Sequence, residues 1–148
     1  MALLFTLILS WVPLIGPVQA IAQADRVDPL AVLHEWDRDR EAAYVAADPT
    51  KLAALYVSGS SAAAADLAIM DTYRERGLRV QRISQQFFSV QVLAVQPARI
   101  KLRTVERFAG GLVLGEGRCQ QLAPTFPVRR EVALVHDGNR WRVESVSR

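Results

Sequence analysis

The fold is decided first by residues 33–56, which read LHEWDRDREAAYVAADPTKLAALY. Apolar side chains recur here at three- and four-residue spacing, which is typical of an amphipathic helix. The helical pattern is interrupted by Asp48-Pro49, an acidic N-cap followed by proline at the first helical position. Asp28-Pro29 gives the same signal upstream. The sequence therefore predicts a helix over residues 29–47 and a short second helix over residues 49–56.

A third helix and then a change of period follow this stretch. Residues 62–76 keep the helical spacing, and Gly77 is the expected left-handed stop. From Leu78 onward apolar and polar residues alternate, which indicates β-strands. We expect strands at 79–96, 99–108, 112–122, 128–136 and 140–146, a turn at 109–111, and a hairpin turn at Asp137-Gly138-Asn139. The alternation slips at 85–88, which predicts a bulge in the first strand.

Helices followed by a curved antiparallel sheet predict an α+β fold. This order of elements resembles the NTF2-like superfamily, which includes ketosteroid isomerase and the SnoaL-type cyclases. The resemblance is carried by residues 33–56 and by the terminal hairpin VALVHDGNRWRVESV, residues 132–146. The chain is similar in particular to small secreted or membrane-tethered actinobacterial members of this superfamily. The resemblance implies three N-terminal helices packed on a curved antiparallel sheet, in a cone with an interior cavity.

Residues 1–24 contain no charged side chain and divide the chain into this segment and a single domain over residues 25–148. The segment is apolar and ends in small residues, as a secretory signal peptide does. No Lys or Arg precedes the apolar run, so an uncleaved membrane anchor is an alternative. We expect an exported or cell-envelope protein, cleaved or tethered. A cytoplasm-facing anchored domain and a misassigned start remain the other interpretations.

Charge is distributed unevenly along the remaining chain. Residues 25–77 hold ten acidic and six basic side chains, a net of −4, whereas residues 78–148 hold five acidic and twelve basic ones, a net of +7. The arginines are interleaved with apolar residues in strand-like runs, so we expect no nucleic-acid binding. Cys119 is the only cysteine, and neither His34 nor His136 has companions at metal-ligand spacing. We therefore predict no disulfide within the chain, no metal and no cofactor.

Several polar residues fall on core-facing positions of the expected elements. Alternation places Glu106 beside Thr104 on an apolar strand face, with Arg130 as the candidate counter-ion. On the first helix, the i,i+3 spacing of Asp37 and Arg40 allows these two side chains to pair. The expected ligand pocket is lined by Trp36, Asp37, Arg40, Tyr73, Thr104, Glu106, Arg130 and Trp141. The alternative is that these charges form internal salt bridges with no ligand.

The opposite face of the second strand is basic. It carries Arg99, Lys101, Arg103 and Arg107. This face is a candidate interaction surface for an acidic partner, for lipid headgroups or for a second copy of the chain. The alternative is a solvated sheet face that only discourages aggregation.

These patterns favour a non-catalytic domain that binds a partner protein or a small apolar ligand. The alternative is a small cavity enzyme of the isomerase, dehydratase or cyclase type. No catalytic residue is assigned, because fold resemblance does not carry function. A deep, closed cavity lined by Glu106 beside a tyrosine would favour the enzyme. A shallow or side-chain-filled cavity would favour the interaction domain.

Overall fold

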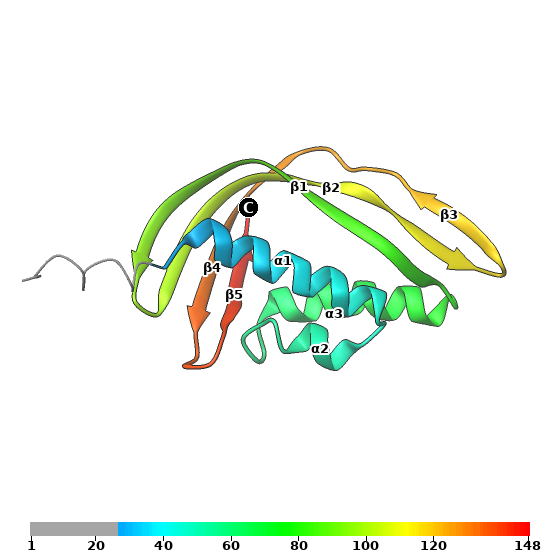
Figure 1. Cartoon of the computed structure of the whole chain (residues 1–148), viewed down its shortest axis with the longest axis horizontal. Coiled ribbons are helices and arrows are strands. Elements are labelled where there is room, and N and C mark those ends of the chain that lie inside the picture. The colour runs from blue at the N-terminus through cyan, green and yellow to red at the C-terminus, as the bar shows by residue number, and fades with distance from the viewer. Residues whose placement is uncertain (1–26) are drawn as a thin grey trace, which may run out of the picture.

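The computed structural model describes residues 27–148. Three helices come first in the chain and five strands follow them in one antiparallel sheet. Figure 1 shows the long strands arching over the helices, which lie beneath the concave side of the arch. The α+β architecture expected from the sequence is confirmed for this part of the chain. The predicted signal or anchor segment, residues 1–24, lies outside the described residues.

The helices begin where the capping signals place them. They are α1 (Pro29–Val45), α2 (Pro49–Ala53) and α3 (Ser61–Glu75). The carboxylates of Asp28 and Asp48 each accept hydrogen bonds from two backbone N–H groups of the first turn. Ser60 caps α3 with its hydroxyl, which accepts a hydrogen bond from the N–H of Ala63. α1 and α2 are shorter than predicted, and α1 ends where Ala47 adopts a positive φ of 50°.

Gly77 ends α3 in the left-handed conformation that the sequence predicts, with φ of 66°. The N–H of Gly77 donates to the carbonyl of Arg74, and the N–H of Leu78 donates to that of Tyr73. This paired closure is the Schellman motif, which satisfies carbonyl groups that the helix leaves open. The chain then turns directly into the first strand.

The sheet has the strand order β1-β2-β4-β5, with β3 pairing beside β2. The strands are β1 (Arg79–Gln96), β2 (Arg99–Gly115), β3 (Arg118–Leu122), β4 (Val128–His136) and β5 (Trp141–Ser147). The register between β1 and β2 shifts at Ser84/Gln85 and again at Phe87/Ser89. These irregularities lie where the alternation slips, and bulges of this kind bend a strand. The bend lets the sheet curve over the helices.

The predicted turn at residues 109–111 is wrong, because β2 runs through it without interruption. A Cβ atom on Gly111 would lie 2.6 Å from the carbonyl oxygen of Arg82 on β1. The glycines at this point therefore allow two strands to approach closely in the bend. The chain reverses later, at Glu116 and Gly117, where both residues have positive φ.

The hydrophobic core lies between the helices and the concave sheet face. Leu33 of α1, Leu52 of α2, Met70 of α3, and Leu102 and Leu134 of the sheet are almost completely buried. The loop after α2 is joined to β5, because Val57 donates its N–H to the carbonyl of Val143. Among the helices of residues 27–148, none combines the length and the apolarity needed to cross a membrane.

Candidate functional site

A cavity of about 410 Å³ lies between the helices and the concave sheet face. Its size falls in the range of small-molecule sites. Aromatic and aliphatic side chains from both layers form much of its wall, among them Phe87 and Phe108 of the sheet and Tyr73 and Ile69 of α3. Three carboxylates reach it, and they come from three different elements: Asp37 on α1, Asp66 on α3 and Glu106 on β2.

Asp66 is enclosed by three partners. Arg40 donates to both of its carboxylate oxygens, with Nε 2.6 Å from Oδ2. The Tyr56 hydroxyl donates to Oδ2 at 2.6 Å, and the Tyr44 hydroxyl lies 2.7 Å from Oδ1. The guanidinium of Arg40 also stands 5.0 Å from the centre of the Tyr44 ring. We call these four residues the Asp66 network.

The pKa values within the Asp66 network follow from this geometry. Burial alone would raise the pKa of Asp66, but the hydrogen bonds and charge of Arg40 hold it below its usual range. Burial and the negative charge of Asp66 raise the pKa of both Tyr44 and Tyr56. Asp66 therefore stays ionised and both tyrosines stay neutral at physiological pH.

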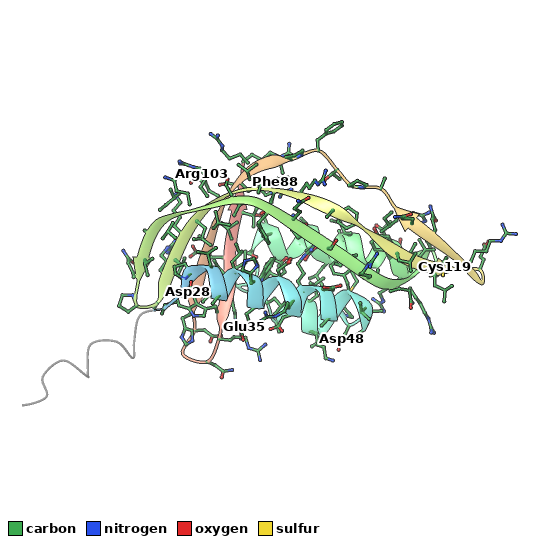
Figure 2. All side chains as sticks on the ribbon, turned by 45° about the horizontal axis from the view of Figure 1, so that its top comes forward. Asp28, Glu35, Asp48, Phe88, Arg103 and Cys119 are labelled. Atoms are coloured by element: carbon green, nitrogen blue, oxygen red, sulfur yellow. The ribbon has the colours of Figure 1, made fainter. Side chains whose placement is uncertain are left out.

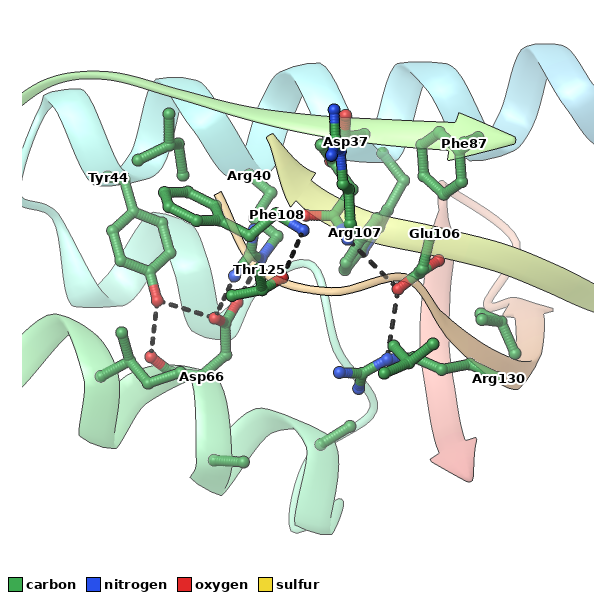
Figure 3. A pocket seen from close by; sticks show the side chains of 18 of the residues that line it. Asp37, Arg40, Tyr44, Asp66, Phe87, Glu106, Arg107, Phe108, Thr125 and Arg130 are labelled. Atoms are coloured by element: carbon green, nitrogen blue, oxygen red, sulfur yellow. Dashed lines mark hydrogen bonds and ion pairs between the residues drawn. The ribbon is translucent and has the colours of Figure 1, made fainter. Parts of the chain in front are cut away.

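Glu106 is held in a similar way on the sheet side of the cavity (Figure 3). Thr104 donates its hydroxyl to Oε2 at 2.8 Å, and the Gln85 amide donates to Oε1 at 3.3 Å. Nε of Arg130 lies 3.3 Å from Oε1 in an ion pair without the alignment of a directed hydrogen bond. Arg130 is thus the counter-ion of Glu106, as the strand faces suggest.

Asp37 differs from the other two carboxylates. Within residues 27–148 its carboxylate makes neither a hydrogen bond nor an ion pair, although its side chain faces the cavity. Burial raises the pKa of Asp37 to about 6, and the nearby charges of Glu106 and Glu41 add to this effect. Arg40 and His34 act in the opposite direction but do not cancel it. Asp37 is therefore a carboxyl group that gains or loses its proton near neutral pH.

Six of the eight predicted pocket residues line this cavity: Trp36, Asp37, Arg40, Tyr73, Glu106 and Arg130. Thr104 is completely buried and reaches the cavity only through its bond to Glu106. The placement of Trp141 in the same pocket is wrong. Its ring packs against His136 beside the β4–β5 turn and lines a second hollow of about 340 Å³. Trp36 stands between the two hollows and contributes to both.

The expected contact between Asp37 and Arg40 does not form, because Arg40 is bound to Asp66. Asp66 is a residue that the sequence reasoning missed. A signal for it exists: Asp66 lies three residues after Ala63 and four before Met70, and all three are buried on the same side of α3. A charged residue on the apolar side of a helix needs a partner from another element.

Three solved structures share this architecture at low sequence identity. Aln2 from a Streptomyces species is 14% identical, with a TM-score of 0.54, over 81% of this chain and 90% of that one. A candidate scytalone dehydratase from Novosphingobium aromaticivorans is 12% identical, with a TM-score of 0.52, over 79% and 80% of the two chains. The intermembrane space region of the chloroplast protein ARC6 is 10% identical, with a TM-score of 0.50, over 82% and 96%.

The chain has an NTF2-like fold. No protein-family model matches the sequence, and a search of curated proteins finds no match. At identities this low, the structural likeness establishes the fold alone.

The outer face of the NTF2-like sheet carries the predicted basic residues, but most of them are paired. Lys101 and Arg103 both bind Glu131, at 3.0 Å and 2.7 Å, and Arg99 binds Glu144. Arg107 donates to the side chain of Gln86. Figure 2 shows Arg103 and Phe88 on the convex side of the arch, away from the helices. The positive charge of these basic residues is thus partly neutralised by acidic side chains of the same face.

The part of the chain that the structure describes holds no group of three His, Cys, Asp or Glu side chains suited to a metal ion. The two histidines have other neighbours. The His34 ring packs edge-on against Phe87, and His136 accepts a hydrogen bond from the N–H of Gly138. What the cavity offers chemically is therefore a largely apolar wall, two ion pairs and, among residues 27–148, one carboxyl group without a partner.

Proposed function

We propose that residues 27–148 form a binding domain that takes up a small, largely apolar molecule between the helices and the sheet. The cavity carries this proposal, because it is hollow and has an apolar wall with a few convergent polar groups. A shallow or side-chain-filled interior would have favoured an interaction domain that binds a partner protein. The binding is non-catalytic in this proposal, and the two ion pairs serve to hold the cavity open.

Blocking the mouth of the cavity tests this proposal. Ile69 lines the cavity and is 49% exposed, so Ile69→Trp should obstruct entry without disturbing the core. Val45 on α1 is 48% exposed and lies outside the cavity wall, so Val45→Trp is the matched control. We expect apolar probes to bind the wild type and the control, measured by calorimetry, and to bind Ile69→Trp much more weakly. Equal binding to all three proteins would contradict the proposal.

A second candidate function is acid–base catalysis in the same cavity. The observation that favours it is the pKa of Asp37, which burial raises to about 6, since a general base works best near the pH at which it titrates. One structural neighbour is a candidate scytalone dehydratase, which is compatible with this second function but does not establish it. Asp37 would abstract a proton next to a carbonyl group of a bound substrate.

Proton exchange tests the catalytic candidate without knowledge of the natural substrate. A panel of cyclic ketones in D₂O is followed by NMR for deuterium uptake at the carbon next to the carbonyl. Catalysis predicts faster uptake with the wild type and loss of that acceleration in Asp37→Asn. Binding without acceleration would leave the non-catalytic proposal in place and remove this one.

Export, with or without cleavage of residues 1–24, also remains a proposal. It is supported by the charge-free apolar segment and the small residues at its end. The intact mass of the protein purified from its own cells would decide between cleavage and retention. A mass equal to that of the whole chain would contradict cleavage and favour the tethered form.

A further inference from the structure

The charges around the cavity are not balanced in the same way at each carboxylate. Asp66 is neutralised by Arg40, and Glu106 by Arg130. Figure 3 shows Asp66 to the left and Glu106 with Arg130 to the right, with Asp37 above both in the view. Asp37 has no cationic partner among the described residues. Within the described part of the fold, two of the three carboxylates thus have a cationic partner. The third, Asp37, has none and faces the cavity.

The groups that face Asp37 do not compensate for its charge. On its own helix they are His34, Arg40 and Glu41. The other charged groups of the cavity wall are Asp66 on α3, Glu106 and Arg107 on β2, and Arg130 on β4; Arg130 is paired with Glu106, and Arg107 donates to Gln86. Nε and Nη2 of Arg40 both donate hydrogen bonds to Asp66. An additional positive charge beside Asp37 would therefore be attracted by Asp37, because Arg40 and Arg130 are already paired with the other two carboxylates.

The wall of the cavity indicates what kind of cation fits. A metal ion needs several ligating side chains, and residues 27–148 offer no such group of three. The wall instead presents Trp36, Tyr73 and Phe87, whose ring faces attract organic cations. Ile83 and Val128 extend this apolar surface. A cationic group attached to an apolar body would use both features together.

We propose that the preferred ligand is an organic cation, a protonated amine on a ring-sized apolar body, with its ammonium group bound to the Asp37 carboxylate. This inference rests on the proposed small-molecule binding and names the chemical class of the ligand. The ammonium donates hydrogen bonds to Asp37, and the apolar body lies along the aromatic wall. Binding is predicted to weaken as the pH falls, because protonation of Asp37 removes the attraction.

Three probes of one shape test the inference by calorimetry on the full-length protein: 1-naphthylmethylamine, 1-naphthylmethanol and 1-naphthoate. They are cationic, neutral and anionic, respectively. At about pH 7.5 we expect the amine to bind roughly tenfold more tightly than the alcohol, as one charged hydrogen bond would give. The anion should bind most weakly. At about pH 5, below the pKa of Asp37, the preference for the amine should largely disappear.

Matched variants assign the preference to one carboxylate. Asp37→Asn should bind the amine and the alcohol alike, whereas Asp39→Asn, an exposed position on the same helix, should keep the wild-type preference. His34→Gln should keep the pH dependence, which separates Asp37 from its neighbouring histidine. The wild-type pH series gives an independent reading if Asp37→Asn fails to fold.

The outcomes separate this inference from the proposed function. If the amine and the alcohol bind the wild type equally, the cation inference is overturned and small-molecule binding stands. If no probe binds, both fail. If Asp39→Asn removes the preference and Asp37→Asn does not, the amine occupies the second hollow, which Asp39 lines, and the inference is wrong.

Discussion

Asp66 and Asp37 line the same cavity but lie in opposite surroundings. Asp66 receives hydrogen bonds from Arg40 and two tyrosines, and its pKa is lowered in spite of its burial. Asp37 receives none from residues 27–148, and burial raises its pKa to about 6. The difference shows how the two kinds of buried carboxylate can be told apart. Asp66 has its partners within the fold and stabilises it. Asp37 destabilises the fold and is available to a ligand.

We expect the largest effect on stability from neutralising Asp66. Asp66→Asn leaves Arg40 buried without its counter-ion, so we expect a loss of about 3–5 kcal/mol in the free energy of unfolding. Asp71→Asn is the control, since Asp71 is an exposed residue of the same helix. Urea denaturation measures both variants. A loss below about 1 kcal/mol for Asp66→Asn would contradict a structural role for the network.

Removing one tyrosine hydroxyl is a smaller change to the Asp66 network. Tyr56→Phe deletes one hydrogen bond to the ionised Asp66 and keeps the ring, so we expect a loss of about 2 kcal/mol. Tyr73→Phe serves as the control, because the Tyr73 hydroxyl makes no hydrogen bond within residues 27–148. Thermal and urea unfolding should rank the two variants in this order. A loss for Tyr56→Phe no larger than that for Tyr73→Phe would mean that the Tyr56 hydroxyl does not stabilise the fold.

Asp37→Asn should have the opposite sign and stabilise the protein. The carboxyl titrates near pH 6 in the folded state and near 3.8 in the unfolded chain, so the folded state binds the proton more tightly. The contribution of Asp37 to stability is therefore lost as the pH rises through this window. At about pH 7.5 we expect a gain of about 1 kcal/mol, reduced because the cavity admits water.

The pH dependence of this gain is its control. The stability difference between Asp37→Asn and the wild type should shrink toward zero as the pH falls to about 4, because both side chains are then uncharged in the folded state. Urea titrations at a series of pH values measure it. A difference that is constant with pH would show that the charge of Asp37 is not the cause.

The smallest effect is expected on the outer sheet face. Arg99 and Glu144 form an ion pair, but half of the Arg99 side chain is exposed to solvent. Exposed pairs contribute little, so Arg99→Ala should change the free energy of unfolding by less than about 1 kcal/mol. Urea denaturation at low and high salt measures it. A larger, salt-sensitive loss would mean that the outer face contributes to stability as the cavity does.

Much of the fold could be predicted because its signals are local. Asp28-Pro29, Asp48-Pro49 and Gly77 act on backbone groups a few residues away. The starts of α1 and α2 and the end of α3 follow from them. The glycines of β2 were misread as a turn because their function depends on β1, which passes close to Gly111. Sequence alone does not show which backbone will approach a glycine.

The candidate site was predicted where alternation decides it and missed where distant partners do. Glu106 and Thr104 share a face because neighbouring side chains of a strand alternate, and Arg130 follows from the same rule on β4. The choice of Arg40 between Asp37 and Asp66 depends on how α1 packs against α3. Spacing within α1 favours the wrong partner, and no local rule corrects it.

An NMR titration of the side-chain carboxyl carbons of Asp37 and Asp66 in one sample measures the difference between the two carboxylates. We expect a pKa of about 6 for Asp37, whereas the hydrogen bonds and charge of Arg40 should hold the pKa of Asp66 below its usual range. Saturation with 1-naphthylmethylamine should lower the pKa of Asp37 and leave that of Asp66 unchanged. Two carboxyl groups that both titrate near 4 and ignore the amine would contradict the account.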